Sequence, residues 1–164
     1  MADGGASTFI LLVTALLVSS SVSIVLINQW GDMSSAIEDD RRGKEADTKT
    51  SVSFAGDAME VEYDDSVSPH QMTFYLQNTG QYVLDESTLV VIVDGASVTS
   101  TISSTIVPSG TVWNDVKLLK VVVNSSSWTY QNNDGVSLSV VVSSDVTSGF
   151  RGTDSLNLEV RLDV

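Results

Sequence analysis

The stretch TFILLVTALLVSSSVSIVLI, from Thr8 to Ile27, decides the architecture of this chain. It runs for 20 residues without a charge, and a helix of that length spans about 30 Å, the thickness of the hydrocarbon core of a bilayer. A secretory signal peptide would begin with basic residues and carry an apolar run of roughly 7 to 15 residues. The residues before Thr8 include Asp3 and neither Lys nor Arg. We therefore expect a retained membrane anchor, with a cleaved leader as the alternative.

Small residues recur along one side of this segment. Ala15, Ser19 and Ser23 are spaced four residues apart, which places them on one stripe of a helix and lets a second membrane helix approach closely. Two interpretations stay open: the stripe packs against another helix, or the hydroxyls bond back to carbonyls of their own helix.

The helical pattern continues beyond the apolar segment. Trp30 lies where an interfacial aromatic belongs, and apolar residues recur at helical spacing as far as Ile37. We predict a helix from about residue 6 to the low forties, followed by a charged linker from Glu38 to Lys49 in which Gly43 breaks the helix. The predicted organisation is an anchor at 1–30, a helical stalk and linker at 31–49, and a separate domain at 50–164.

The charges that flank the anchor do not decide its topology. Arg41, Arg42, Lys44 and Lys49 all follow the apolar segment, which by the positive-inside rule would place this flank in the cytoplasm. Six acidic residues are interleaved with them between Asp32 and Asp47. The nature of the following domain has to decide.

Composition excludes several functions. The chain has 164 residues, 21 acidic against 8 basic side chains, a net charge of -13, no Cys and one His. A protein that binds nucleic acid through phosphates needs a basic face. Without Cys, the chain has no disulfide framework and no thiol nucleophile.

From Thr50 onward, period-two alternation replaces the helical period and predicts a mainly β fold. Asp94-Gly95, between alternating segments, is a two-residue hairpin signal. The spacing is typical of a β-sandwich, with a small barrel as the alternative. Eight strands are expected, at 50–54, 58–63, 72–77, 88–93, 96–103, 112–124, 136–143 and 155–163. Their inward-facing residues form the expected core: Met59, Val61, Tyr63, Phe74, Leu76, Leu89, Val91, Val93, Trp113, Leu138, Val140, Leu156, Leu158, Val160 and Leu162.

Few residues of this domain suggest chemistry. His70 is expected in a loop, without a Ser, Cys or acidic residue at relay spacing. The pairs Asp64-Asp65 and Asp85-Glu86 could offer oxygen ligands to Ca²⁺, although no EF-hand spacing accompanies them. We expect a hairpin turn at Asn132–Gly135. Asn124 begins an N-glycosylation triplet, which also occurs often by chance. With no phosphate loop, nucleophile elbow or metal-ligand cluster, we expect no enzyme, no metal and no cofactor.

Two stretches resemble a known family: the opening MADGGASTFILLVTALLVSSSVSIVLI and the segment FYLQNTGQYVLDESTLVVIVDGASV. In the second, Asn78-Thr79-Gly80 and Asp94-Gly95 resemble the family's Asn-Thr-Gly turn and the Asp-Gly hairpin that follows it. The chain is similar over about residues 1–100 to FlaG, a membrane-anchored accessory protein of the archaellum (the archaeal flagellum), and more distantly to FlaF.

The resemblance implies a stator role in motility, with no catalytic residues. It implies a single-pass helix in the cytoplasmic membrane and an immunoglobulin-like β-sandwich outside it, in the extracellular or pseudoperiplasmic space. It also implies self-association and a FlaF-like companion that contacts the S-layer. Two alternatives stay open: an archaellin or type IV pilin-like filament subunit, and a membrane-anchored surface module that binds a ligand.

Overall fold

The computed structural model describes residues 3–147 and 149–164. The chain divides into two compact units, Met1–Arg41 and Arg42–Val164. The first is helical. The second holds the end of the same helix and the strands of the described residues.

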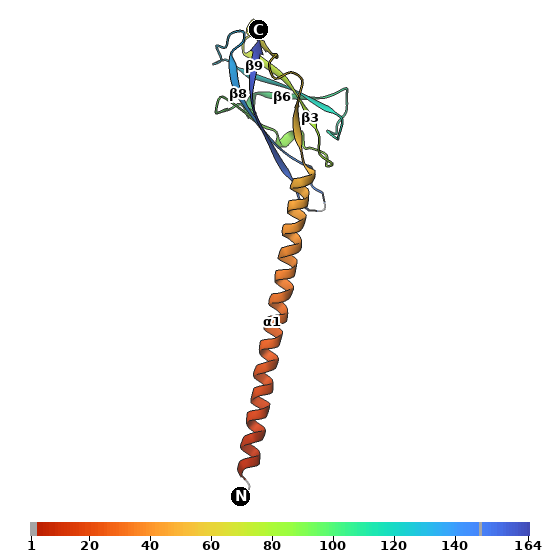
Figure 1. Cartoon of the computed structure of the whole chain (residues 1–164), viewed down its shortest axis with the longest axis vertical. Helices are drawn as coiled ribbons and strands as arrows, with labels where there is room; N and C mark the ends of the chain where they lie inside the picture. The colour runs from red at the N-terminus through yellow and green to blue at the C-terminus, as the bar shows by residue number, and fades with distance from the viewer. Residues whose placement is uncertain (1–2, 148) are drawn as a thin grey trace. The chain divides into compact units, whose positions relative to one another are not determined.

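A single helix, α1, covers Asp3–Lys49 (Figure 1). By length and composition it could cross a membrane, and its most apolar window has no buried residues. The predicted continuation of the helix beyond the apolar segment is confirmed, but the break at Gly43 is wrong, because α1 continues through the charged segment. Ion pairs one turn apart stabilise it there: Arg41 donates to Glu38 at 2.8 Å, and Lys49 donates to Glu45 at 2.5 Å.

Within residues 42–147 and 149–164, the β domain has nine strands in chain order. They are β1 (Val52–Ala55), β2 (Val61–Asp64), β3 (His70–Asn78), β4 (Val90–Val93), β5 (Ala96–Ser97), β6 (Ile102–Val107), β7 (Leu118–Ser125), β8 (Gly135–Ser143) and β9 (Thr153–Asp163). Two short 3-10 helices lie between them, η1 (Glu86–Thr88) and η2 (Thr99–Thr101).

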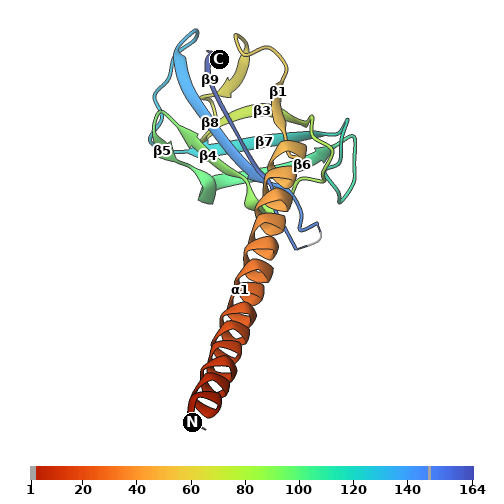
Figure 2. The ribbon, with the colours of Figure 1, turned by 60° about the horizontal axis from the view of Figure 1, so that its bottom comes forward.

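The strands form two layers that are joined at one side. One layer holds β5, β4, β8 and β9, and the other holds β2, β3, β7 and β6, with β1 paired to β3. A short parallel contact, Val61 opposite Leu162, joins β2 to β9. Figure 2 shows β7 crossing behind β8, with β6 next to β7. The predicted mainly β fold after an N-terminal helix is confirmed, and its sheet closes partway, as a half-barrel.

Two of the predicted strands are wrong in extent. The strand expected at 96–103 is divided into β5, η2 and β6, because the chain crosses here from one layer to the other. The strand expected at 112–124 begins only at Leu118, because residues 114–117 form a turn, closed by the Lys117 amide on the Asn114 carbonyl, in which Val116 has φ 64.

The core confirms most of the alternation argument. Trp113, Phe74 and Leu138 are buried between the layers. Met59 was expected inward but is 53% exposed, because β2 begins only at Val61 and Met59 lies in the turn before it. Leu156 and Leu158 are partly buried and pack against the core.

Of the two hairpin turns predicted from local sequence, one is confirmed and one is wrong. Asp94 and Gly95 have φ 48 and 79 and join β4 to β5 as a tight hairpin, the pattern that Asp-Gly favours. Asn132–Gly135 also turns, but the predicted hairpin is wrong, because β7 and β8 lie in different layers. The turn is instead fixed by the Asn133 amide, which donates to the Leu162 carbonyl at 2.8 Å.

The central position of β7 predicts a large effect of truncation. Leu119 is fully buried between β3 and β6, so Leu119→Ala should lower the free energy of unfolding by about 2–5 kcal/mol through lost burial and a cavity. Urea denaturation of the full chain in detergent micelles measures this. The matched control is Met59→Ala at an exposed site, which should change stability by less than about 0.5 kcal/mol. Equal effects would contradict the assigned core.

Candidate functional site: the joint between α1 and the β domain

The last turn of α1 is held by two segments of the β domain that are far apart in sequence. We call this arrangement the joint. It consists of Ala46–Thr50, the turn Asn78–Tyr82 and the segment Gly152–Asp154. All three belong to the unit Arg42–Val164. Ala46 and Thr50 are buried there, at 3% exposure each.

The first segment caps the carbonyl end of the helix. The Lys49 carbonyl accepts hydrogen bonds from the amides of Gln81 at 2.7 Å and Tyr82 at 3.2 Å. The Ser51 carbonyl accepts from Thr79 at 3.0 Å and from Gly80 at 3.1 Å. The last carbonyls of a helix lack partners within the helix, so this turn provides them.

Asn78 holds that turn in shape from within the core. Its side chain is 1% exposed and donates to the carbonyls of Tyr82 at 2.8 Å and Trp113 at 3.0 Å. Its amide oxygen accepts from the Gly80 amide at 2.9 Å. The side chain therefore satisfies its polar groups while it links the joint to the core.

Gly80 has no side chain because the helix end occupies that space. A Cβ at Gly80 would lie 2.5 Å from the Lys49 carbonyl oxygen and 2.6 Å from the Ser51 nitrogen. The Asn78-Thr79-Gly80 turn that the sequence singled out is thus the place where the backbones of helix and domain meet.

The second segment was not foreseen from the sequence. A Cβ at Gly152 would overlap the Ala46 carbonyl and the Thr50 hydroxyl. The Asp47 carboxylate accepts from the Thr153 amide at 3.0 Å, and Asp154 accepts from the Val52 amide at 2.9 Å. No local signal marks these residues, because their partners lie about a hundred positions away.

Lys49 adds a charged contact at the surface of the joint. Its ammonium lies 5.6 Å from the centre of the Tyr82 ring. The hydrogen bond to Glu45 raises the pKa of Lys49, and partial burial opposes this. The charged form of Lys49 is therefore favoured.

The predicted membrane-segment residues lie on α1. Ala15, Ser19 and Ser23 are exposed in the structure, and the Ser23 hydroxyl donates to the Ser19 carbonyl at 2.8 Å. Trp30 is 72% exposed. The unit Met1–Arg41 holds them all.

The other candidates are dispersed over the β domain. His70 was expected in a loop but begins β3, with its ring centre 6.1 Å from that of Tyr63. Asn124 lies near the end of β7, and its amide nitrogen donates to the Thr101 carbonyl at 3.2 Å. Within the described residues, no three His, Cys, Asp or Glu side chains gather as a metal site.

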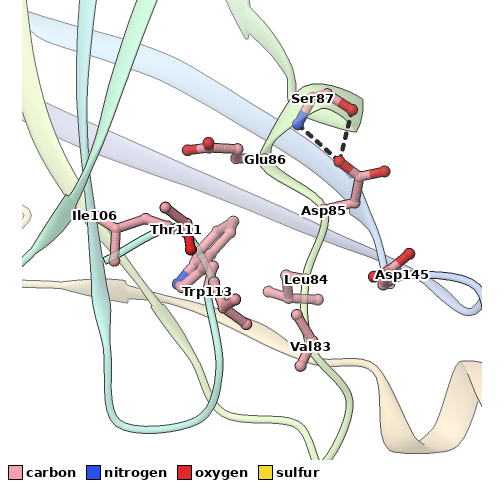
Figure 3. Close-up of a pocket in the computed structure, with 10 residues that line it drawn as sticks. Val83, Leu84, Asp85, Glu86, Ser87, Ile106, Thr111, Trp113 and Asp145 are labelled. Atoms are coloured by element: carbon pink, nitrogen blue, oxygen red, sulfur yellow. Dashed lines mark hydrogen bonds between the residues drawn. The ribbon is translucent and has the colours of Figure 1, made fainter. Parts of the chain in front are cut away.

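A cleft lies between β6 and the segment leading into η1 (Figure 3). Its walls include Leu84, Ile106 and Trp113, and Glu86 and Asp145 stand at its rim.

Asp85 caps η1 by accepting from the Ser87 amide at 3.1 Å and the Ser87 hydroxyl at 2.6 Å. These bonds, and the Arg151 guanidinium 3.1 Å away, lower the pKa of the Asp85 carboxyl against the opposing effect of burial.

Comparison with known proteins assigns the chain to a family. Residues 2–151 match the family model of archaeal-type flagellin, which covers both α1 and most of the β domain. The protein belongs to the archaeal-type flagellin family. No curated protein matches the chain. Membership of this structural family supports an archaellum-related structural role. The expected relation to the archaellum is confirmed at this level.

Three glycines of this flagellin-family protein give a matched test of the joint. Gly80→Ala and Gly152→Ala should each destabilise the β domain by about 1–3 kcal/mol, because the added methyl meets backbone atoms that cannot move aside. Gly43→Ala is the control. Its site in α1 is open, and alanine is the better helix former, so stability should stay equal or rise by up to about 1 kcal/mol.

Hydrogen exchange measures the location of the effect. The amides of Gln81 and Thr153, which bond to the helix end, should lose protection in the Gly80 and Gly152 variants and keep it in the Gly43 variant. Unchanged protection in all three would contradict the joint.

The lowered pKa of Asp85 predicts an acid-sensitive contribution to stability. A carboxyl whose pKa is lower in the folded state stabilises the protein above its unfolded pKa, ordinarily about 3.9, and loses that contribution as the pH falls through the folded pKa. Asp85→Asn should therefore be less stable at pH 7, and its stability should fall less steeply below pH 4. Ser87→Ala, which removes the largest cause, should flatten the profile in the same way. Parallel profiles for all three proteins, measured by urea denaturation, would refute this.

Proposed function

We propose that the protein is a membrane-anchored stator component of the archaellum, similar in role to FlaG. The observation that carries the proposal is the continuity of α1 with the β domain. The apolar helix has no break before the joint, where hydrogen bonds and two close backbone contacts hold its last turn. A part that resists torque needs such a connection, because a flexible linker transmits little force.

The anchor segment suits a lipid environment. Each polar group in a bilayer has to be satisfied within the protein. Ser20 donates to the Leu16 carbonyl, and Ser21 and Ser23 donate to carbonyls four residues earlier at 2.8 Å. One helix can therefore occupy the bilayer with these hydroxyls satisfied. We propose the division into an anchor at 1–30, a stalk at 31–49 and a β domain at 50–164.

The topology and partners follow from the resemblance to FlaG. We propose that the β domain lies outside the cytoplasmic membrane, where its 14 acidic and 4 basic residues give a well-hydrated surface. Self-association would use the stripe of Ala15, Ser19 and Ser23, which is free of bulky side chains. The companion would be a FlaF-like protein that contacts the S-layer.

A second candidate is a filament subunit, an archaellin. The match to archaeal-type flagellin over residues 2–151 favours it directly. An exposed apolar helix can pack against copies of itself in a filament core as well as against lipid.

Cell fractionation separates the two candidates. In cells that carry a C-terminally tagged chain, a stator should remain with the membrane after filaments are sheared off, and its deletion should abolish swimming. A filament subunit should be abundant in the sheared filaments, and its deletion should remove them. Mass spectrometry of the native N-terminus adds an independent readout, because a filament subunit requires leader cleavage.

A glycine variant in the joint and a control variant in α1 test whether the joint bears force. Under the stator proposal, Gly152→Ala should reduce swimming while the protein remains in the membrane, and Gly43→Ala should leave swimming unchanged. Normal swimming with Gly152→Ala, at an unchanged protein level, would contradict a force-bearing joint.

A further inference from the structure

One strand of the β domain has a free edge without protection. β6 is the last strand of its layer, and within the described residues it pairs with β7 alone. Its sequence, ISSTIV, has no charge and no proline. Natural edge strands usually carry a charge, a proline or a bulge that prevents further pairing. The outer amides and carbonyls of β6 are therefore available to another strand.

The cleft described above lies beside this edge. It has a volume of about 290 Å³ and is lined by Ile106 of β6 on one side and by residues 83–87 on the other. No residue of β7, the strand on the other side of β6, lines it. Leu84 and Trp113 are buried behind its surface, whereas the lining residues Val83 and Val112 are accessible. These two valines can contact an aliphatic side chain from a strand added along β6.

Within the described part of the chain, two carboxylates without a basic partner line the cleft beside this edge. Figure 3 shows the Glu86 side chain extending toward β6, where its carboxylate lies 3.4 Å from the Ser104 hydroxyl. Asp145 stands on the opposite side. Arg151 offsets the charge of Asp85, and the Lys117 ammonium, beside the cleft end of β6, is engaged with the carbonyl of the cleft residue Val112 at 3.3 Å. Glu86 and Asp145 have no basic partner among the described residues.

We propose that β6 is a docking edge for an extended segment of a partner protein. The segment adds as a strand along β6, places an aliphatic side chain in the cleft, and brings a Lys or Arg to Glu86. Main-chain hydrogen bonds provide affinity in this mode, and the side chains provide specificity. A second copy of this chain is disfavoured as the occupant, because each β domain has 14 acidic against 4 basic residues and would repel its like. The inference goes beyond the proposed function, since a stator or a filament subunit could use this edge.

A synthetic strand tests the proposal directly. The probe is the peptide acetyl-Lys-Val-Arg-Val-Lys-Val-amide, titrated by calorimetry into the full chain in detergent micelles. We expect saturable binding with one peptide per chain, and slower hydrogen exchange at alternate amides of β6. A peptide of the same charge with N-methyl groups at successive amides, which blocks both edges of the strand, should bind about tenfold more weakly, because it cannot donate main-chain hydrogen bonds to β6.

Charge variants locate the site. Glu86→Gln combined with Asp145→Asn should weaken binding about tenfold. Glu60→Gln combined with Glu62→Gln changes the net charge equally at exposed positions away from the cleft, and should leave binding nearly unchanged. Both pairs replace exposed or rim carboxylates by isosteric amides, so neither removes a core contact.

Four results would overturn the proposal. They are absence of binding, equal binding of the N-methylated peptide, equal loss of binding in the two charge variants, and a dimer of the chain that Ser103→Lys dissociates. The first removes the docking edge, and the second and third reduce it to general charge attraction. The fourth assigns the edge to a second copy. None of them bears on fractionation or swimming, so this test and that of the proposed function fail independently.

Discussion

Close backbone approach at Gly80 and Gly152 is the constraint on which the described structure of the β domain and the end of α1 depends. At both positions the space of a side chain is occupied by the last turn of the helix. This allows the Lys49 carbonyl to be capped by the turn after β3, and the Asp47 carboxylate to be reached from the start of β9. Because β3 is a central strand of one layer and β9 an edge of the other, the helix end is fixed to both layers of the half-barrel at once.

The same half-barrel explains why one edge is available. β2 and β9 join the two layers on one side. On the opposite side, β6 pairs with β7 along one edge only, and within the described chain its outer edge has no neighbouring strand. Closed barrels remove such edges. Here the layers diverge instead, and a cleft with an apolar wall and an acidic rim lies at the opening. The joint and the open edge thus give one small domain two separate contacts, one toward its own anchor and one toward another protein.

Much of the fold could be predicted from local pattern. The period of two in VEY and in VSLSV places Val61, Tyr63 and Leu138 inside, and Asp94-Gly95 specifies its hairpin by its own dihedral preferences. The errors share a cause. Local propensity predicts a helix break at Gly43 and one continuous strand over 96–103, and tertiary contacts override both. Glu45, Lys49 and the capping turn sustain the helix past Gly43, and the change of layer divides the strand.

The sequence by itself determined the apolar helix, the acidic β domain that follows it and the absence of any cysteine chemistry, because these depend on composition and on periods of a few residues. The folded sheet alone brings Asn78, Gly80 and Gly152 to one place, and among the described residues it leaves the outer edge of β6 without a neighbouring strand. The physical reason is the range of the interaction. Asp47 and Thr153 are separated by 106 positions, and only the folded sheet brings such residues within hydrogen-bonding distance.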